Sequence, residues 1–157
     1  MICLVYVDDK ILCGPNLDKI NEEIRGLGIK GEDQVHSFQL KDEGQVGDFL
    51  GIRIEKLGPG TFNLTQSGLT NKVLAAANMT DYNSVPTPNS TVFLSIDAEG
   101  DRFDEDWEYA TVLGMLVYLA QNSRPDISYA VHQCARFTHA PRKSHVIGKK
   151  LGLGTFN

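Results

Sequence analysis

Two adjacent carboxylates, Asp8 and Asp9, are the residues of this chain best suited to chemistry. Like charges side by side repel each other, and a hard cation such as Mg²⁺ relieves that repulsion because it prefers oxygen ligands. Two such ions, about 3.5–4 Å apart, can stabilise the attacking and leaving oxygens of a phosphoryl transfer. An Asp-Asp pair can also be a simple polar turn, and the two residues taken alone favour that interpretation.

The segments on either side of the pair predict a β-hairpin. Residues 2–7 and 10–13 are apolar and partly β-branched, so we expect two strands joined by the two-residue loop Asp8-Asp9. Because side chains alternate along a strand, Cys3 and Cys13 should project to opposite faces and should not form a disulfide.

Helix and strand patterns continue after the hairpin. Asn16 is a good cap for a short amphipathic helix that stops near Gly28. Residues 35–40 weakly predict a strand, whereas residues 48–57 alternate between apolar and other side chains as a half-buried strand does. A Gly-Pro-Gly turn follows, and residues 61–64 predict the returning strand.

The second half of the chain is predicted to be helical. Thr65 can cap a helix that runs to about Ala77, and residues 80–103 have the Pro, Asn, Ser and Thr content of a linker. Apolar stripes over residues 107–122 and 125–137 predict two further helices. The predicted fold class is therefore α+β, with hairpins and one helix followed by an all-helical segment.

Length and composition limit the class of protein. A chain of 157 residues that is 41% hydrophobic suits one ordinary domain or two small subdomains. No apolar run approaches the roughly 20 residues of a membrane-spanning helix, and no basic segment precedes the opening strand, so we expect no membrane partner and no secretory signal. Three cysteines without metal-type spacing predict a reducing, intracellular setting, in the cytoplasm or the nucleus.

Charge is unevenly distributed along the chain. The net charge of −5 argues against a protein that grips nucleic acid by bulk electrostatics. Acidic side chains crowd residues 97–108, a pattern that favours a solvated surface. Residues 136–150 contain no acidic side chain but carry a set of basic ones, for which a phosphate-contacting surface and a solvated surface both remain open: Arg136, Arg142, Lys143, Lys149 and Lys150.

The motifs around the carboxylates resemble a known family. Tyr6-Val7-Asp8-Asp9 followed by Ile11-Leu12-Cys13-Gly14 is similar to the catalytic hairpin of reverse transcriptases. Further motifs of copia-type LTR retrotransposon reverse transcriptases, which are parts of Pol polyproteins, follow in matching order: Phe38-Gln39-Leu40-Lys41-Asp42, Phe49-Leu50-Gly51-Ile52, Leu64-Thr65-Gln66, Thr87-Pro88, Gly114–Ala120, Arg124–Val131, Arg136-Phe137, Pro141, His145 and Gly154-Thr155. One motif is weak support, but the ordered series covers nearly the whole chain.

The resemblance implies roles for individual residues in an RNA-directed DNA polymerase. Asp8 would be the main ligand of a catalytic Mg²⁺ (or Mn²⁺) ion, Asp9 its weaker companion, and Tyr6 would lie beside the primer end or the template base. The segment Phe49-Leu50-Gly51 would form the primer grip. The partners of the complete enzyme would be a primer on an RNA or DNA template and a deoxynucleoside triphosphate (dNTP).

The resemblance also implies a division into three parts. Residues 1–65 would be a palm remnant with the catalytic hairpin and the primer grip, and residues 66–106 a thumb helix and linker. Residues 107–157 would be a helical connection segment, whose basic side chains would contact the primer–template: Arg136, Arg142 and Lys143.

Ordinary packing is expected for several aromatic side chains. Tyr118 and Tyr129 are predicted to be core residues rather than platforms for stacking bases. The four histidines share no ligand spacing and are predicted to be surface or packing residues: His36, His132, His139 and His145.

The family pattern is incomplete in this sequence. Reverse transcriptases need a third carboxylate from an earlier palm strand and fingers that bind the incoming nucleotide, whereas five residues precede Tyr6. Downstream, Gly148 and Gly152 interrupt the basic helix of the family. We therefore expect a fragment that is inactive alone and depends on a missing N-terminal fingers and palm region. Two alternatives are a non-catalytic nucleic-acid-binding or assembly module and a degenerate pseudogene product.

Overall fold

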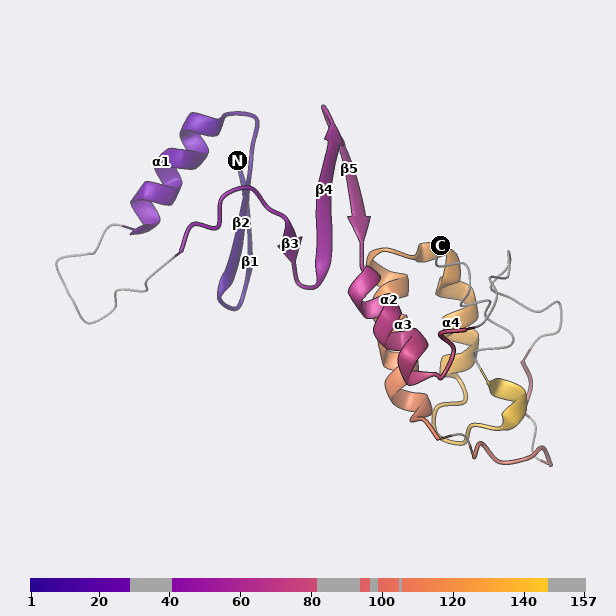
Figure 1. Cartoon of the computed structure of the whole chain (residues 1–157). Coiled ribbons are helices and arrows are strands. Elements are labelled where there is room, and N and C mark those ends of the chain that lie inside the picture. The colour runs from indigo at the N-terminus through magenta and orange to yellow at the C-terminus, as the bar shows by residue number, and fades with distance from the viewer. Residues whose placement is uncertain (29–40, 82–93, 97–98, 105, 147–157) are drawn as a thin grey trace, which may run out of the picture. The chain divides into compact units, whose positions relative to one another are not determined.

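The structure is a computed structural model, and it describes residues 1–28, 41–81, 94–96, 99–104 and 106–146. The chain divides into two compact units, residues 1–49 and residues 50–157, and each is described by itself. Small antiparallel sheets come first along the chain and helices follow (Figure 1), so the predicted α+β class is confirmed. Among the described residues, no helix combines the length and the apolar character that crossing a bilayer requires.

The first unit opens with an antiparallel hairpin of β1 (Ile2–Tyr6) and β2 (Asp9–Cys13). Tyr6 lies opposite Asp9, so the two-residue loop is Val7-Asp8. The predicted loop Asp8-Asp9 was wrong by one residue. The turn closes earlier because Val7 adopts a φ of 52°, a conformation that β-branched residues rarely take and that residue type alone does not predict.

Helix α1 (Leu17–Gly28) follows the hairpin, as predicted. The side-chain oxygen of Asn16 accepts a hydrogen bond from the backbone N–H of Lys19 at 3.1 Å, which confirms the cap. The strand predicted over residues 35–40 lies outside the described residues. Within the described part of the first unit, no side chain is buried.

A second turn interrupts the strand that was predicted over residues 48–57. The short strand β3 (Asp48–Phe49) ends at Leu50-Gly51, and β4 (Ile52–Gly58) begins directly after this turn. Leu50 and Gly51 have φ angles of 53° and 74°, the pattern of a type I′ turn. The continuous strand was therefore a wrong prediction, because alternation of apolar residues does not reveal a reversal of the backbone.

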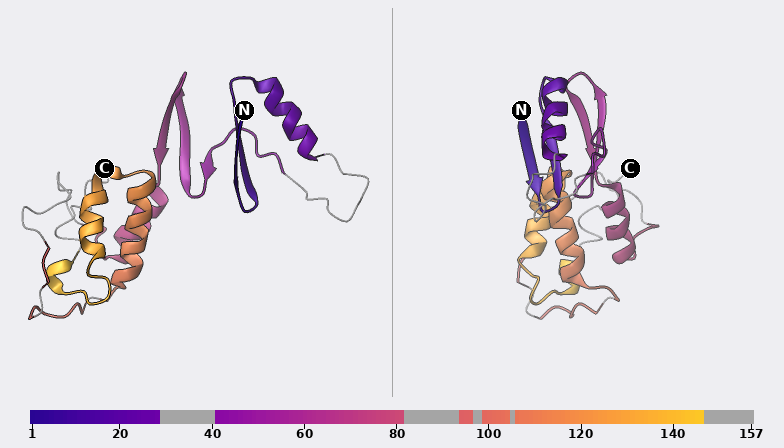
Figure 2. Two further views of the ribbon diagram at one scale, coloured as in Figure 1. Left: turned by 180° about the vertical axis from the view of Figure 1, so that it is seen from behind. Right: turned by 90° about the vertical axis from the view of Figure 1, so that its left-hand side faces the viewer.

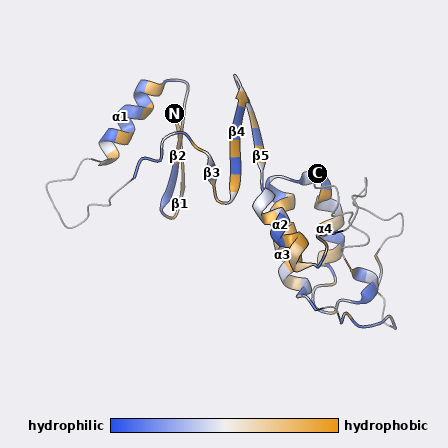
Figure 3. Cartoon of the chain, viewed as in Figure 1, coloured by the Kyte–Doolittle hydropathy of each residue, from blue (hydrophilic) through white to orange (hydrophobic). Residues whose placement is uncertain are grey.

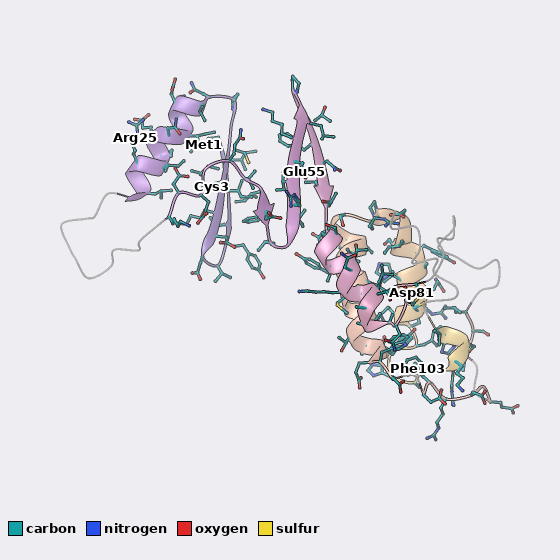
Figure 4. The ribbon with its side chains drawn as sticks, viewed as in Figure 1. Met1, Cys3, Arg25, Glu55, Asp81 and Phe103 are labelled. Carbon is teal, nitrogen blue, oxygen red and sulfur yellow. The ribbon has the colours of Figure 1, made fainter. Side chains whose placement is uncertain are left out.

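The β4 strand pairs antiparallel with β5 (Thr61–Thr65), and the Gly-Pro-Gly turn between them is as predicted. Ile54 lies opposite Leu64, and apolar and polar side chains alternate along β4 (Figure 3). On the exposed face of β4, Arg53 forms an ion pair of 3.0 Å with Glu55, which is labelled in Figure 4.

The remaining described elements of the second unit are helical. They are α2 (Ser67–Ala76), α3 (Tyr109–Asn122), the 3₁₀ turn Pro125–Ile127, α4 (Ser128–Ala135) and the 3₁₀ turn Lys143–His145. Gln66, not Thr65, is the N-cap residue of α2, and its side chain makes no capping bond. The cap prediction was wrong because the helix begins one residue later than the Thr65 pattern suggested.

The core of the chain lies between α2, α3 and α4, with α3 and α4 side by side in both views of Figure 2. Its fully buried side chains come from all of these helices: Val73, Val112, Leu116, Leu119, Ile127 and Val131. Two expected core residues are instead on the surface. Tyr118 is 39% exposed and Tyr129 is 49% exposed, because both project from the helices away from the shared apolar stripes.

Candidate functional site

The Val7-Asp8 turn presents two carboxylates to solvent. Asp8 occupies the second turn position, and Asp9 is the first residue of β2; both are exposed. Neither carboxylate has an ion-pair partner among the described residues. Residues directly opposite each other in a hairpin project to the same face, so the Tyr6 ring and the Asp9 carboxylate share one face of the ribbon.

The donor set at this turn suits a hard cation but does not complete a metal site. Asp8 and Asp9 offer the carboxylate oxygens that Mg²⁺ and Mn²⁺ prefer. In the part of the chain that the structure describes, no group of three His, Cys, Asp or Glu side chains could hold a metal ion. This hairpin can therefore supply only part of the coordination that a metal would need.

The surface of the hairpin is unusually apolar for an exposed structure. Tyr6 is 57% exposed and Val7 is 80% exposed, and Ile2, Leu4 and Val5 are each more than half exposed. Cys3 and Cys13 are free thiols on opposite faces, as predicted, with Cys3 labelled in Figure 4.

The segment Phe49-Leu50-Gly51 forms a tight turn. Phe49 and Leu50 are half-buried and Gly51 is exposed. The backbone carbonyl of Leu50 accepts a hydrogen bond from the hydroxyl of Tyr118 on α3 at 2.7 Å. This contact joins residues 68 positions apart in the sequence, and neither the spacing nor the residue types of the two motifs predicted it.

Three basic residues were predicted to bind nucleic acid, and two of them lie against the acidic stretch of residues 97–108. The guanidinium of Arg142 donates to the carbonyl of Gly100 at 3.1 Å, and the Lys143 ammonium lies 3.1 Å from a carboxylate oxygen of Asp104. The backbone N–H of Lys143 also donates to the Asp101 carbonyl at 3.0 Å. Described residues of the acidic stretch and of the basic stretch are therefore in contact, which the charge pattern of the sequence did not predict.

The third basic residue, Arg136, is more accessible. Its side chain is exposed, its guanidinium donates to the side-chain oxygen of Gln133 at 3.0 Å, and it lies 5.5 Å from the centre of the Phe137 ring. Arg142 and Lys143 each contact the stretch of residues 97–108, whereas the described contacts of Arg136 are with Gln133 and Phe137 on its own segment.

A buried aromatic cluster holds the basic stretch in place. His145 is 2% exposed and stacks on Phe137 at 3.9 Å. Its Nδ1 accepts from the Arg142 N–H at 3.1 Å, and its Nε2 lies 3.1 Å from the carbonyl oxygen of Ser95. His145 is thus a packing residue, one of the two roles predicted for it.

Tyr109 completes this cluster from the start of α3. Its hydroxyl donates to the carbonyls of Cys134 at 3.1 Å and of His145 at 3.3 Å. Burial raises the pKa of the Tyr109 phenol well above its ordinary value, so the hydroxyl stays a donor throughout the physiological range. Phe103, labelled in Figure 4, packs edge-on against this ring at 5.5 Å.

Comparison with known proteins identifies the family. A family model described as reverse transcriptase (RNA-dependent DNA polymerase) matches residues 1–91. The chain is 32% and 31% identical to the retrovirus-related Pol polyproteins from transposons RE1 and RE2 of Arabidopsis thaliana, over 91% and 90% of its length. It is also 26% identical, over 90% of its length, to a putative transposon Ty5-1 protein of Saccharomyces cerevisiae. No solved structure matches the chain significantly.

The match to these relatives is partial in extent. The chain spans 9% of each Arabidopsis polyprotein and 44% of the yeast protein. The matched region of the family model includes both the Asp8-Asp9 corner and the Leu50-Gly51 turn. The chain therefore belongs to the reverse transcriptase (RNA-dependent DNA polymerase) family, as a segment of the kind found in the Pol polyproteins of copia-type retrotransposons.

Proposed function

We propose that this chain is the part of a retrotransposon reverse transcriptase that carries two of the carboxylates of the metal site and the turn that holds the primer. In the complete protein it would serve two-metal nucleotidyl transfer from a dNTP to a primer on an RNA or DNA template. The observation that carries the proposal is the Tyr6-Val7-Asp8-Asp9 turn, whose two carboxylates are exposed and unpaired among the described residues.

Within this proposal, Asp8 and Asp9 hold a divalent ion, Mg²⁺ or Mn²⁺. The ion would supply Lewis-acid stabilisation of the oxygens that attack and leave during phosphoryl transfer. Tyr6 shares a face with Asp9, which suits a ring that lies beside the primer end or the template base. Phe49-Leu50-Gly51 then serves as the primer grip.

The proposed division of labour follows the chain order. Residues 1–65 belong to the palm, residues 66–106 to a thumb helix and linker, and residues 107–157 to a helical connection. We propose that the chain is inactive alone, because two carboxylates on one turn leave the ligands of two ions incomplete. Catalysis by positioning tolerates little error, since a misplacement of about 1 Å can cost about 10²-fold in rate.

Manganese binding tests the metal assignment directly. In ¹⁵N NMR spectra of the chain titrated with Mn²⁺, we expect paramagnetic broadening centred on the amides of residues 7–10. Asp8→Asn should remove most of it. The doubly substituted Glu22→Gln, Glu23→Gln is the matched control, because it neutralises another pair of adjacent exposed carboxylates. Broadening that follows the glutamate pair, or that survives Asp8→Asn unchanged, would contradict the assignment.

Primer extension tests the proposal at the level of activity. The chain with primer–template, Mg²⁺ and dNTPs should incorporate no label. Substituted for the corresponding segment of an active copia-type polymerase, it should support extension, and Asp8→Asn in that chimera should reduce the rate by about 100-fold or more. Asp18→Asn is the control and should leave the rate unchanged. Extension that is insensitive to Asp8→Asn would overturn the catalytic role.

A second candidate function is non-catalytic nucleic-acid binding through the basic side chains, and the exposed guanidinium of Arg136 favours it. Affinity for a primer–template should then fall steeply with salt, and Arg136→Gln should make that dependence shallower. Asp104→Asn should strengthen binding, because it removes a negative charge that lies 3.1 Å from the Lys143 ammonium. Affinity that does not change with salt would exclude this function.

A further inference from the structure

Tyr118 in the C-terminal half of α3 and its C-cap residue Ser123 contact the two ends of the β4–β5 hairpin. At the entrance, the Tyr118 hydroxyl donates to the carbonyl of Leu50 at 2.7 Å. At the exit, the Ser123 hydroxyl donates to the side-chain oxygen of Gln66 at 2.7 Å. Leu50 precedes β4 by two residues and Gln66 follows β5 directly, so the two contacts bracket the hairpin.

The entrance contact falls where the backbone needs support. Leu50 has a φ of 53°, which is costly for a residue with a side chain, and Gly51 follows with a φ of 74°. Such conformations persist only where surrounding structure holds them. A hydrogen bond to the carbonyl between these two residues limits rotation of the peptide group that they share.

Tyr118 is well placed to be a fixed support. The neighbouring α3 residues Leu116 and Leu119 are fully buried, which fixes the helix against the core. Tyr118 itself is 39% exposed, and its own carbonyl accepts from the Asn122 side chain at 2.8 Å. Because the ring is not needed to fill the core, the role of the hydroxyl can be separated from packing.

The exit contact differs in kind. Gln66 is 4% exposed, and its side-chain nitrogen has no hydrogen-bond partner in the described structure. A buried donor without a partner is unfavourable, so the nitrogen does not stabilise the position of the Gln66 side chain. The hydrogen bond that Ser123 donates to the oxygen of Gln66 is the described polar contact that does. The exit contact therefore joins the N-cap residue of α2 to the C-cap residue of α3, whereas the entrance contact lies within the Leu50-Gly51 turn.

We propose that Tyr118 is a positioning residue for the Leu50-Gly51 turn. Its hydroxyl holds the turn in its left-handed conformation, so that the helical part of the chain sets the geometry with which Phe49-Leu50-Gly51 meets the primer. The link to the primer rests on the proposed function, whereas the link to the turn rests on the contact of 2.7 Å alone.

Tyr118→Phe in the full chain tests the proposal, because it removes only the donor. We expect the carbonyl ¹³C resonance of Leu50 and the amide ¹⁵N resonance of Gly51 to shift. Tyr129→Phe is the matched control, since Tyr129 is a comparably exposed tyrosine, at 49%, on the next helix. It should leave both resonances in place. Ser123→Ala should move the side-chain amide of Gln66 and not the Leu50 carbonyl.

Primer–template affinity, measured by fluorescence anisotropy on the same variants, provides the functional readout. Tyr118→Phe should weaken binding by about 2- to 12-fold, the equivalent of one neutral hydrogen bond, and Tyr129→Phe should not. Unmoved Leu50 and Gly51 resonances would overturn the positioning role whatever the affinity. Moved resonances with unchanged affinity would show that the turn is held but does not serve the primer. A wild-type chain that binds no primer–template would contradict the primer-gripping role proposed for this turn, while the resonances still decide whether Tyr118 holds the turn.

Discussion

The two units of this chain differ in what holds them together. In the described part of residues 1–49 no side chain is buried, and the β1 strand exposes apolar residues on both faces. Residues 50–157 contain a core in which Leu116, Leu119 and Ile127 are at most 1% exposed. A two-stranded hairpin is marginally stable in water without a covered face. The proposed catalytic turn thus lies in the unit whose described residues include no buried side chain. Tyr118, which contacts the proposed primer turn, lies in the unit that contains the core.

The largest effect is expected from a cavity in the helical core. Leu116→Ala removes a fully buried side chain and should lower the free energy of unfolding by about 2–5 kcal/mol. Leu4→Ala in β1 is the matched control, since Leu4 is 51% exposed and its truncation should change stability by only about 0.5 kcal/mol. Denaturant unfolding followed by circular dichroism measures both. Equal losses in the two variants would refute the contrast between the units.

A smaller loss is expected at the polar centre of the same unit. Tyr109→Phe keeps the ring but leaves the carbonyls of Cys134 and His145 without their shared donor, so we expect a loss of about 1–3 kcal/mol. Denaturant unfolding at neutral pH provides the measurement, and Tyr129→Phe, on the surface of α4, should be nearly neutral. A neutral Tyr109→Phe would mean that water satisfies the two carbonyls and that this region is not tightly closed.

The regular parts of both units could be predicted from the sequence. Apolar spacing predicted α1, α2, α3 and α4, and the Gly-Pro-Gly turn with its flanking alternation predicted the β4–β5 hairpin. These signals are local, because the period of a helix or a strand is set by backbone geometry. Ordered motifs predicted the family for the same reason: they are read along the chain.

The parts that failed depend on contacts between distant residues or on rare backbone conformations. The positive φ angles of Val7 and Leu50 fall on residue types that avoid them, so the first turn was placed one residue too late and the second was not predicted at all. Tyr118 was predicted to be core because it lies on an apolar helix, yet its hydroxyl reaches a carbonyl 68 residues away. The pairing of Lys143 with Asp104 was likewise invisible, because charge patterns do not specify their partners.

The contrast between the two units can also be tested in the first unit, by relieving the backbone strain at Val7. Val7→Gly removes a β-branched residue from a φ of 52°, a relief of about 1–2 kcal/mol that outweighs the entropic cost of glycine, about 0.5–1 kcal/mol. Val7 is 80% exposed, so little packing is lost. We expect amide exchange in β1 and β2 to slow about two- to fivefold while exchange in α3 is unchanged. Faster exchange in the hairpin would show that the turn does not limit its stability; Val46→Gly, without positive φ, is the control.

The smallest expected effect concerns a surface ion pair at the joint between α3 and α4. The guanidinium of Arg124 donates to both carboxylate oxygens of Asp126, at 2.8 and 2.7 Å, and these hydrogen bonds lower the pKa of Asp126, although partial burial opposes them. Because the folded pKa lies below the unfolded one, the pair stabilises the fold above the ordinary Asp pKa of about 3.9, and this contribution is lost as the pH falls through the folded pKa.

Arg124→Gln should therefore raise the pKa of Asp126 towards its ordinary value and weaken the dependence of stability on pH in the acid range. We expect little change from this pair at pH 7, because water screens the Asp126 carboxylate, whose side chain is 51% exposed. The ¹³C resonance of the Asp126 carboxyl, followed from pH 2 to 6, measures the shift. Arg102→Gln, which changes an exposed arginine elsewhere in the same unit, should leave that titration curve in place. An unchanged curve in Arg124→Gln would mean that the lowered pKa has another source. A large loss of stability at neutral pH would mean that the second unit depends on this joint as well as on its core.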